Sequence, residues 1–227
     1  MSLLLVKQAV GEKAATLIKN GMIVGLGTGS TANCFIDSLI LRCRREKLSI
    51  QAVASSHQSA DRAAKGGIEI LDINEAPRID ITVDGADEID PLKRMIKGGG
   101  GAHVREKILA AASREMVVIV DESKLVPQIG VGKLPVEILY YGSPATRLKI
   151  ENLGLKGMWR MTEEDSLFIT ENGNVLFDIS FDSPPPFPEE IHEELLHIPG
   201  VIDTGFFFGL AGRVLVGYLD GRIEIRD

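Results

Sequence analysis

The sequence predicts an α/β protein with a Rossmann-like open, mostly parallel sheet that has helices on both faces, plus a smaller ferredoxin-like α+β domain. Two observations predict the sheet. Short apolar runs, typical of strands that are buried on both faces, alternate with helical periodicities. Turns rich in glycine or acidic residues follow several of these runs. A third observation, a change of pattern after Pro127, predicts the smaller domain.

The first half of the chain alternates between the two patterns from its start. Apolar residues at positions 3, 6, 10, 14 and 17 have helical spacing, which predicts a helix over residues 3–19. Each predicted strand is a short apolar run. The predicted strands are 22–26, 50–54, 68–71, 79–83 and 116–120. Further helical stretches reach about residue 46, lie near 58–65 and cover 102–114. The segment from Asp84 to Gly101 is predicted to be a loop.

The second half has the element order of a split βαβ fold. The elements follow one another as strand 134–140, helix 143–153, strands 156–160 and 174–181, helix 188–197 and strand 201–208. Two last apolar runs flank Asp220-Gly221, a hairpin signal, and we expect them to return to the first domain. We therefore predict a catalytic domain of residues 1–130 and 209–227, and a small domain of residues 131–208.

Composition excludes several classes of function. The 227 residues carry a formal net charge of -7, and nucleic-acid binding, which needs a broad basic face, is disfavoured. Two cysteines and four scattered histidines predict neither a disulfide scaffold nor a metal site, so no metal and no cofactor are expected. No signal peptide or membrane span is visible. We expect a cytoplasmic protein with a small-molecule partner.

The segment from Gly25 to Thr31, GLGTGST, lies between a predicted strand and a predicted helix. Its glycines let the backbone approach an anion, and the helix start offers N–H groups and the positive end of a dipole. Thr28, Ser30 and Thr31 add hydroxyl donors. The segment lacks the third glycine of the dinucleotide fingerprint and the lysine of a P-loop. A phosphate cradle and a plain turn with Ser30 or Thr31 as the helix cap both remain open.

A second segment, Asp84-Gly85-Ala86-Asp87-Glu88, follows a predicted strand. Side chains at the carboxyl ends of parallel strands point into the crevice where open α/β sheets bind ligands. Two carboxyl groups three residues apart can acquire different pKa values, which suits proton transfer. The alternative is a solvated acidic turn.

The third segment begins with Lys97 and continues through Gly98, Gly99, Gly100 and Gly101. Ordering four consecutive glycines costs much backbone entropy, and close approach to a ligand is a better reason for them than a turn. Glu106 falls in the first turns of the following helix, where it could equally complement the helix dipole.

Two lysines complete the candidate set. Lys124 ends Asp121-Glu122-Ser123-Lys124, which follows the apolar run MVVIV, and it could reach an anion in the same crevice. Lys7 lies beside the apolar face of the first predicted helix. A surface lysine and a snorkelling lysine are the alternatives.

The motifs GLGTGST, VDGADEID, IKGGGGA with REK behind it, and DESK, in this order, resemble those of A-type ribose-5-phosphate isomerases. The resemblance implies metal-independent interconversion of ribose 5-phosphate and ribulose 5-phosphate by a homodimer or homotetramer. It implies that Glu106 is the proton acceptor and that Lys7 lies on the phosphate side. The substrate-binding residues that it implies are Thr28, Gly29, Ser30, Thr31, Asp84, Gly85, Ala86, Asp87, Lys97, Gly98, Gly99, Gly100 and Lys124.

Chemistry assigns finer roles within this set. Asp84 is the candidate for proton exchange with the sugar oxygens, including ring opening, with Asp87 supporting it. Lys97 and backbone amides would stabilise the oxyanion. A sugar-phosphate sensor would need no Glu106 and usually carries a DNA-binding segment, which we do not expect before residue 22. A nucleotide-dependent enzyme is the other alternative, and the missing third glycine disfavours it.

Overall fold

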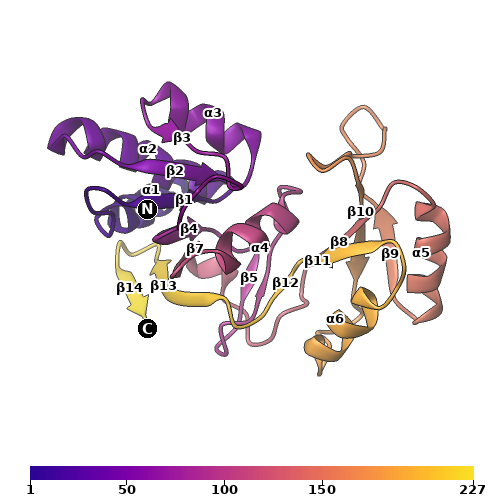
Figure 1. The fold of residues 1–227 in the computed structure, drawn as a ribbon. Coiled ribbons are helices and arrows are strands. Elements are labelled where there is room, and N and C mark those ends of the chain that lie inside the picture. Colours follow the sequence, from indigo (N-terminus) through magenta and orange to yellow (C-terminus); the bar gives the residue numbers. More distant parts are fainter. The chain divides into compact units, whose positions relative to one another are not determined.

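The computed structural model describes residues 1–227 (Figure 1). The chain forms two compact units. The first unit consists of Met1–Ala86, Arg105–Leu125 and Leu210–Asp227. The second consists of Asp87–Val104 and Val126–Gly209. None of the helices combines the length and the apolar composition that crossing a lipid bilayer requires.

A seven-stranded sheet forms the centre of the first unit, in the order β14-β13-β7-β4-β1-β2-β3. Its strands are β1 (Ile23–Leu26), β2 (Gln51–Ala54), β3 (Glu69–Ile70), β4 (Ile81–Asp84), β7 (Met116–Asp121), β13 (Ala211–Gly217) and β14 (Ile223–Arg226). All neighbours are parallel except the β13–β14 hairpin. The predicted mostly parallel sheet is confirmed, and the last two strands belong to this unit as expected.

Helices cover both faces of this sheet. They are α1 (Leu3–Ala15), α2 (Ser30–Glu46), α3 (His57–Lys65) and α4 (His103–Ala111). On one face Val24 and Leu26 of β1 share a core with Phe35 of α2. On the other face Ile23 shares a core with Leu109 of α4. Successive strand residues point to opposite faces, so a strand that is buried on both sides is apolar throughout.

The second unit contains a four-stranded antiparallel sheet in the order β11-β8-β10-β9. Its elements are β8 (Lys133–Ile138), α5 (Ser143–Asn152), β9 (Lys156–Trp159), β10 (Val175–Ser180), α6 (Pro188–Leu196) and β11 (Val201–Thr204). Val136 and Phe177 of the sheet share a core with Ile150 of α5 and Leu195 of α6. This is the ferredoxin-like order that the sequence predicts.

A small third sheet was not predicted. The segment 84–101, expected to be a loop, contains β5 (Glu88–Ile89) and β6 (Met95–Ile96). They pair with each other and with β12 (Phe206–Phe207), which is separated from β11 within the predicted strand 201–208. A strand of two residues is too short to show an alternation of apolar and polar residues. Only its pairing with distant residues defines it.

The second unit also begins earlier than the predicted small domain. Residues 87–104 and 126–130 were assigned to the catalytic domain, whereas the structure groups them with the four-stranded sheet in the second unit. One cause is the buried carboxylate of Glu88, which accepts hydrogen bonds from three successive amides, at 2.6 Å from Gly130, 3.2 Å from Val131, and also from Gly132. This acid therefore anchors the segment that leads into β8.

Candidate functional site

The glycine-rich loop connects β1 to α2, and its conformation tests whether Ser30 or Thr31 caps the helix. The residue that caps α2 is Gly29, which makes no side-chain capping bond, and Ser30 is the first residue of the helix. The interpretation of Ser30 or Thr31 as the cap is therefore wrong. The Ser30 hydroxyl accepts a hydrogen bond of 2.9 Å from Nζ of Lys7 on α1. A lysine ammonium and a helix N-terminus thus meet at one place, which favours an anion.

Thr28 is held within the same loop by residues that the sequence did not single out. Its hydroxyl lies 2.7 Å from the Ser55 hydroxyl and 2.9 Å from the Ser56 hydroxyl. Both serines follow directly after β2, and Ser59 in α3 donates to the Gly27 carbonyl at 2.7 Å. The signal that was overlooked is this serine group at a strand end, where ligand loops gather in open α/β sheets.

Asp84, the last residue of β4, lies against this loop. It is 1% exposed, and its Oδ1 accepts hydrogen bonds from the amides of Gly85 at 2.7 Å and Thr28 at 3.1 Å. A Cβ atom at Gly27 would stand 2.0 Å from the same oxygen, so only glycine fits there beside the carboxylate. The carboxyl group predicted to exchange protons is therefore fixed next to the predicted phosphate loop.

Asp87 and the glycine run lie in the second unit. The exposed Asp87 accepts a hydrogen bond of 2.7 Å from the Gly99 amide through Oδ2. Lys97 is 2% exposed, and its ammonium lies 5.4 Å from the centroid of the Phe207 ring. The structure thus brings Asp87 together with the segment 97–100 and gives that segment an ordered conformation.

Glu106 and Lys124 are placed by their own elements. Glu106 is 4% exposed and lies in the first turn of α4. Lys124 lies in a single 3-10 turn (Glu122–Lys124) directly after β7, and it is half-buried. The two preceding acids are structural: Asp121 caps the turn, and Glu122 accepts a hydrogen bond of 2.9 Å from the Leu219 amide. Of this segment, Lys124 remains the ligand candidate.

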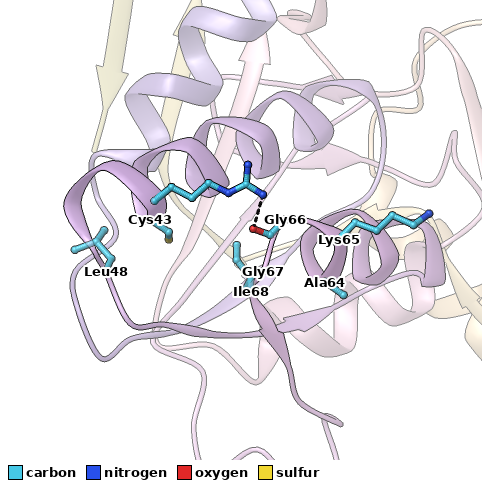
Figure 2. Close-up of a pocket in the computed structure, with 8 residues that line it drawn as sticks. Cys43, Leu48, Ala64, Lys65, Gly66, Gly67 and Ile68 are labelled. Atoms are coloured by element: carbon cyan, nitrogen blue, oxygen red, sulfur yellow. Dashed lines mark hydrogen bonds between the residues drawn. The ribbon is translucent and has the colours of Figure 1, made fainter.

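A cavity of about 470 Å³ lies elsewhere in the first unit (Figure 2). It is formed by the C-terminal ends of α2 and α3 and by the residues just before β3. It is lined by Cys43, Arg44, Leu48, Ala64, Lys65, Gly66, Gly67 and Ile68. Arg44 donates to the Gly66 carbonyl at 3.0 Å, and burial raises the pKa of the Cys43 thiol, which keeps it protonated at neutral pH. This cavity is at the amino ends of the parallel strands, whereas the loops after β1 and β4 are at their carboxyl ends. None of the predicted site residues lines it.

The candidate residues of the first unit therefore lie in the segments that follow β1, β4 and β7 and on the helices α1 and α4. No group of three or more His, Cys, Asp or Glu side chains is arranged to hold a metal ion. In the first unit the candidate residues are Lys7, the segments 28–31 and 84–86, Glu106 and Lys124; Asp87 and the segment 97–100 form a separate group within the second unit. Hydroxyl, amide and ammonium donors suit a phosphate, and the buried carboxyl groups suit proton transfer.

Comparison with known proteins agrees with this chemistry. Residues 51–221 match the family model described as ribose 5-phosphate isomerase A (phosphoriboisomerase A). The ribose-5-phosphate isomerase A of Protochlamydia amoebophila is 46% identical over 219 residues, which cover 96% of this chain and 94% of that protein. The structure of ribose 5-phosphate isomerase from Plasmodium falciparum superposes with a TM-score of 0.95 at 31% identity and covers 99% of this chain and 98% of that one.

A third similar structure carries a ligand. It is a D-ribose-5-phosphate isomerase in complex with phospho-erythronic acid, 34% identical, with a TM-score of 0.94 and full coverage of both chains. The match to the family model spans well over half of the chain, and the identity to curated relatives extends over nearly all of it. The chain belongs to the ribose 5-phosphate isomerase A family.

Proposed function

We propose that the protein interconverts D-ribose 5-phosphate and D-ribulose 5-phosphate, as an aldose–ketose isomerase of the non-oxidative pentose phosphate pathway. The observation that carries the proposal is the hydrogen bond from the Thr28 amide to the Asp84 carboxylate. It joins an anion-binding loop to a buried acid, and a sugar phosphate needs both. Family membership supports the same substrate.

The phosphate binds to the segment 28–31, Lys7 and Lys124 in this proposal. The start of α2 offers backbone N–H groups, and Lys7 already contacts Ser30 at 2.9 Å. Charge-assisted hydrogen bonds of this kind hold an anion firmly. Because the phosphate is remote from C1 and C2, its binding energy can orient the reacting carbons.

The isomerisation is a proton transfer between two carbons. Asp84, supported by Asp87, exchanges protons with the sugar oxygens and opens the furanose ring. Glu106 removes the proton from C2, which leaves an enediolate, and returns it to C1 to give the ketose. Lys97 and backbone N–H groups stabilise the negative charge on oxygen while it develops.

The phosphate assignment predicts the effect of Lys124→Ala. Removing one charge-assisted contact should weaken substrate binding by about 1.5–3 kcal/mol, with a smaller effect on kcat. Steady-state kinetics with ribose 5-phosphate would measure this, and unphosphorylated ribose should be a very poor substrate. Lys65→Ala, which removes an exposed lysine beside the opposite cavity, is the matched control and should behave as wild type. Equal turnover of ribose and ribose 5-phosphate would refute the assignment.

The scheme assigns no step to a metal or a cofactor, because carboxyl groups move the protons while a lysine and amides stabilise the charge. Activity should therefore survive dialysis against EDTA. The measurement is ribulose 5-phosphate formation before and after chelation, with a zinc-dependent enzyme treated in parallel to verify the chelation. Loss of activity with EDTA and its recovery with a divalent ion would overturn the metal-free scheme.

Location and assembly are part of the proposal. Both cysteines are free thiols, which is consistent with a reducing cytoplasm. We expect a homodimer or a homotetramer, and light scattering coupled to size-exclusion chromatography would distinguish the two from each other and from a monomer.

A further inference from the structure

An arginine of the second unit holds the backbone of the glycine run. Arg160 follows β9, and its Nη1 donates to the carbonyls of Gly98 at 2.8 Å and Gly99 at 3.2 Å. Its Nε and Nη2 donate to the two carboxylate oxygens of Asp178 at 2.9 and 2.6 Å. The Arg160 side chain is 16% exposed and the Asp178 side chain 9%. A bidentate pair of this kind fixes the plane of the guanidinium.

These bonds determine which way the peptide groups of the run face. In a planar trans peptide, the carbonyl of one residue and the N–H of the next point in opposite directions. Since the Gly98 carbonyl faces Arg160, the Gly99 amide must face away, and there it donates to Asp87 at 2.7 Å. Since the Gly99 carbonyl also faces Arg160, the Gly100 amide faces away from it as well.

Phe168 completes the support. The Arg160 guanidinium lies 6.0 Å from the centroid of its ring, at the limit of a cation–π contact. A Cβ atom at Gly101 would come within 2.6 Å of atoms of the same ring, and the φ angle of Gly101 is +79°. Arg160, Asp178 and Phe168 thus form a support for the glycine run, at the β9–β10 edge of the four-stranded sheet.

We propose that Arg160 is a positioning residue for the isomerisation: it orients the peptides of the glycine run so that the Gly99 amide holds Asp87 and the Gly100 amide faces the oxyanion of the enediolate. Asp178 acts one step further away, by fixing the guanidinium. The inference rests on the proposed function, because the run needs amides of fixed direction only if charge develops on the substrate oxygens. Neither residue touches the substrate.

The test compares Arg160→Gln with wild type in three measurements. The kcat for ribose 5-phosphate should fall about tenfold to a hundredfold, because a small displacement of groups that act on the reacting atoms is costly, while KM changes little. Affinity for phospho-erythronic acid, which bears a carboxylate on a phosphorylated chain, should fall by the same factor as kcat. Affinity for inorganic phosphate should not change. Asp178→Asn should follow the same pattern with smaller effects.

Two controls separate positioning from a general loss of structure. Arg147→Gln removes an arginine of the same unit that pairs with Glu151 and lies over the Trp159 ring, and it should leave kcat and both affinities unchanged. Millimolar guanidinium ion should restore part of the kcat of Arg160→Ala, since the ion can bind the two carbonyls and Asp178.

The outcomes distinguish this inference from the proposed function. Wild-type protein that does not isomerise ribose 5-phosphate refutes the proposed function, and this role of Arg160 with it. An active wild type with an Arg160→Gln variant of unchanged kcat refutes the inference alone. The inference is also refuted if Arg160→Gln loses affinity for phosphate and for phospho-erythronic acid equally and melts at a lower temperature, and if guanidinium does not rescue Arg160→Ala. Arg160 would then only stabilise the fold.

Discussion

Glu106→Gln is expected to lower kcat about a hundredfold to ten-thousandfold, which corresponds to roughly 3–5 kcal/mol of activation free energy. Glutamine has nearly the size of glutamate and still forms hydrogen bonds, but it cannot accept a proton from carbon. Because the side chain is 4% exposed, a substitution of equal volume is needed to keep the packing of α4. Substrate affinity and melting temperature should remain close to those of wild type.

The competing role for Glu106 predicts a different observable. A carboxylate that only complements the helix dipole contributes about 0.3–1 kcal/mol, and its loss would appear in stability and not in turnover. Glu115→Gln is a suitable control, because Glu115 pairs with Arg213 at 2.6 Å near the start of β7 and should affect stability only. Solvent deuterium incorporation at C1 of the product follows the carbon proton directly. A Glu106→Gln enzyme that keeps its turnover and still exchanges deuterium would transfer the base to Asp84 or Asp87.

Asp84→Asn should abolish most turnover while substrate binding persists. Two backbone amides, those of Thr28 and Gly85, donate to one oxygen of this side chain, Oδ1, and the asparagine carbonyl can accept the same two bonds. The substitution therefore changes the group at the Oδ2 position and retains the attachment to the glycine-rich loop. The variant isolates proton transfer from loop geometry, and a comparison of kcat with the dissociation constant of ribose 5-phosphate measures the two separately.

Asp80→Asn provides the matched control for Asp84→Asn. Asp80 lies just before the other end of β4, where its carboxylate accepts a hydrogen bond of 2.9 Å from the Ile23 amide and pairs with Arg78. It should change the free energy of unfolding and leave turnover intact. Near-normal turnover of Asp84→Asn would assign ring opening to Asp87 or to water.

The parts of the fold that the sequence predicted are those governed by local pattern. The run MIVGL predicted a strand buried on both faces, and β1 is fully buried. The strand and helix order after Pro127 predicted the ferredoxin-like sheet, since each element there is long enough to show its period. The small sheet of β5, β6 and β12 was missed because it is defined by pairing between distant segments.

The candidate site was predictable where the residue type itself is unusual for its position. A lysine beside the apolar face of the first helix indicated Lys7, and its ammonium does reach Ser30. Arg160 gave no such signal, because its partner Gly98 is 62 positions away along the chain. The same applies to Ser55, whose contact with Thr28 depends on the pairing of β1 with β2. Long-range contacts of this kind follow from topology and leave no trace in local composition.

The close approach of Gly27 to Asp84 has a consequence for reading the sequences of other proteins with this fold. A methyl group at position 27 would occupy the space that the carboxylate needs, with 2.0 Å between Cβ and Oδ1. The two positions therefore cannot vary independently during evolution. The Cβ atom of Asp84 would lie only 2.5 Å from that methyl group, so a smaller residue at position 84 would not by itself make room for alanine or serine at position 27. A side chain at position 27 would thus identify, from a genome alone, a protein in which the loop and the end of β4 no longer approach each other in this way.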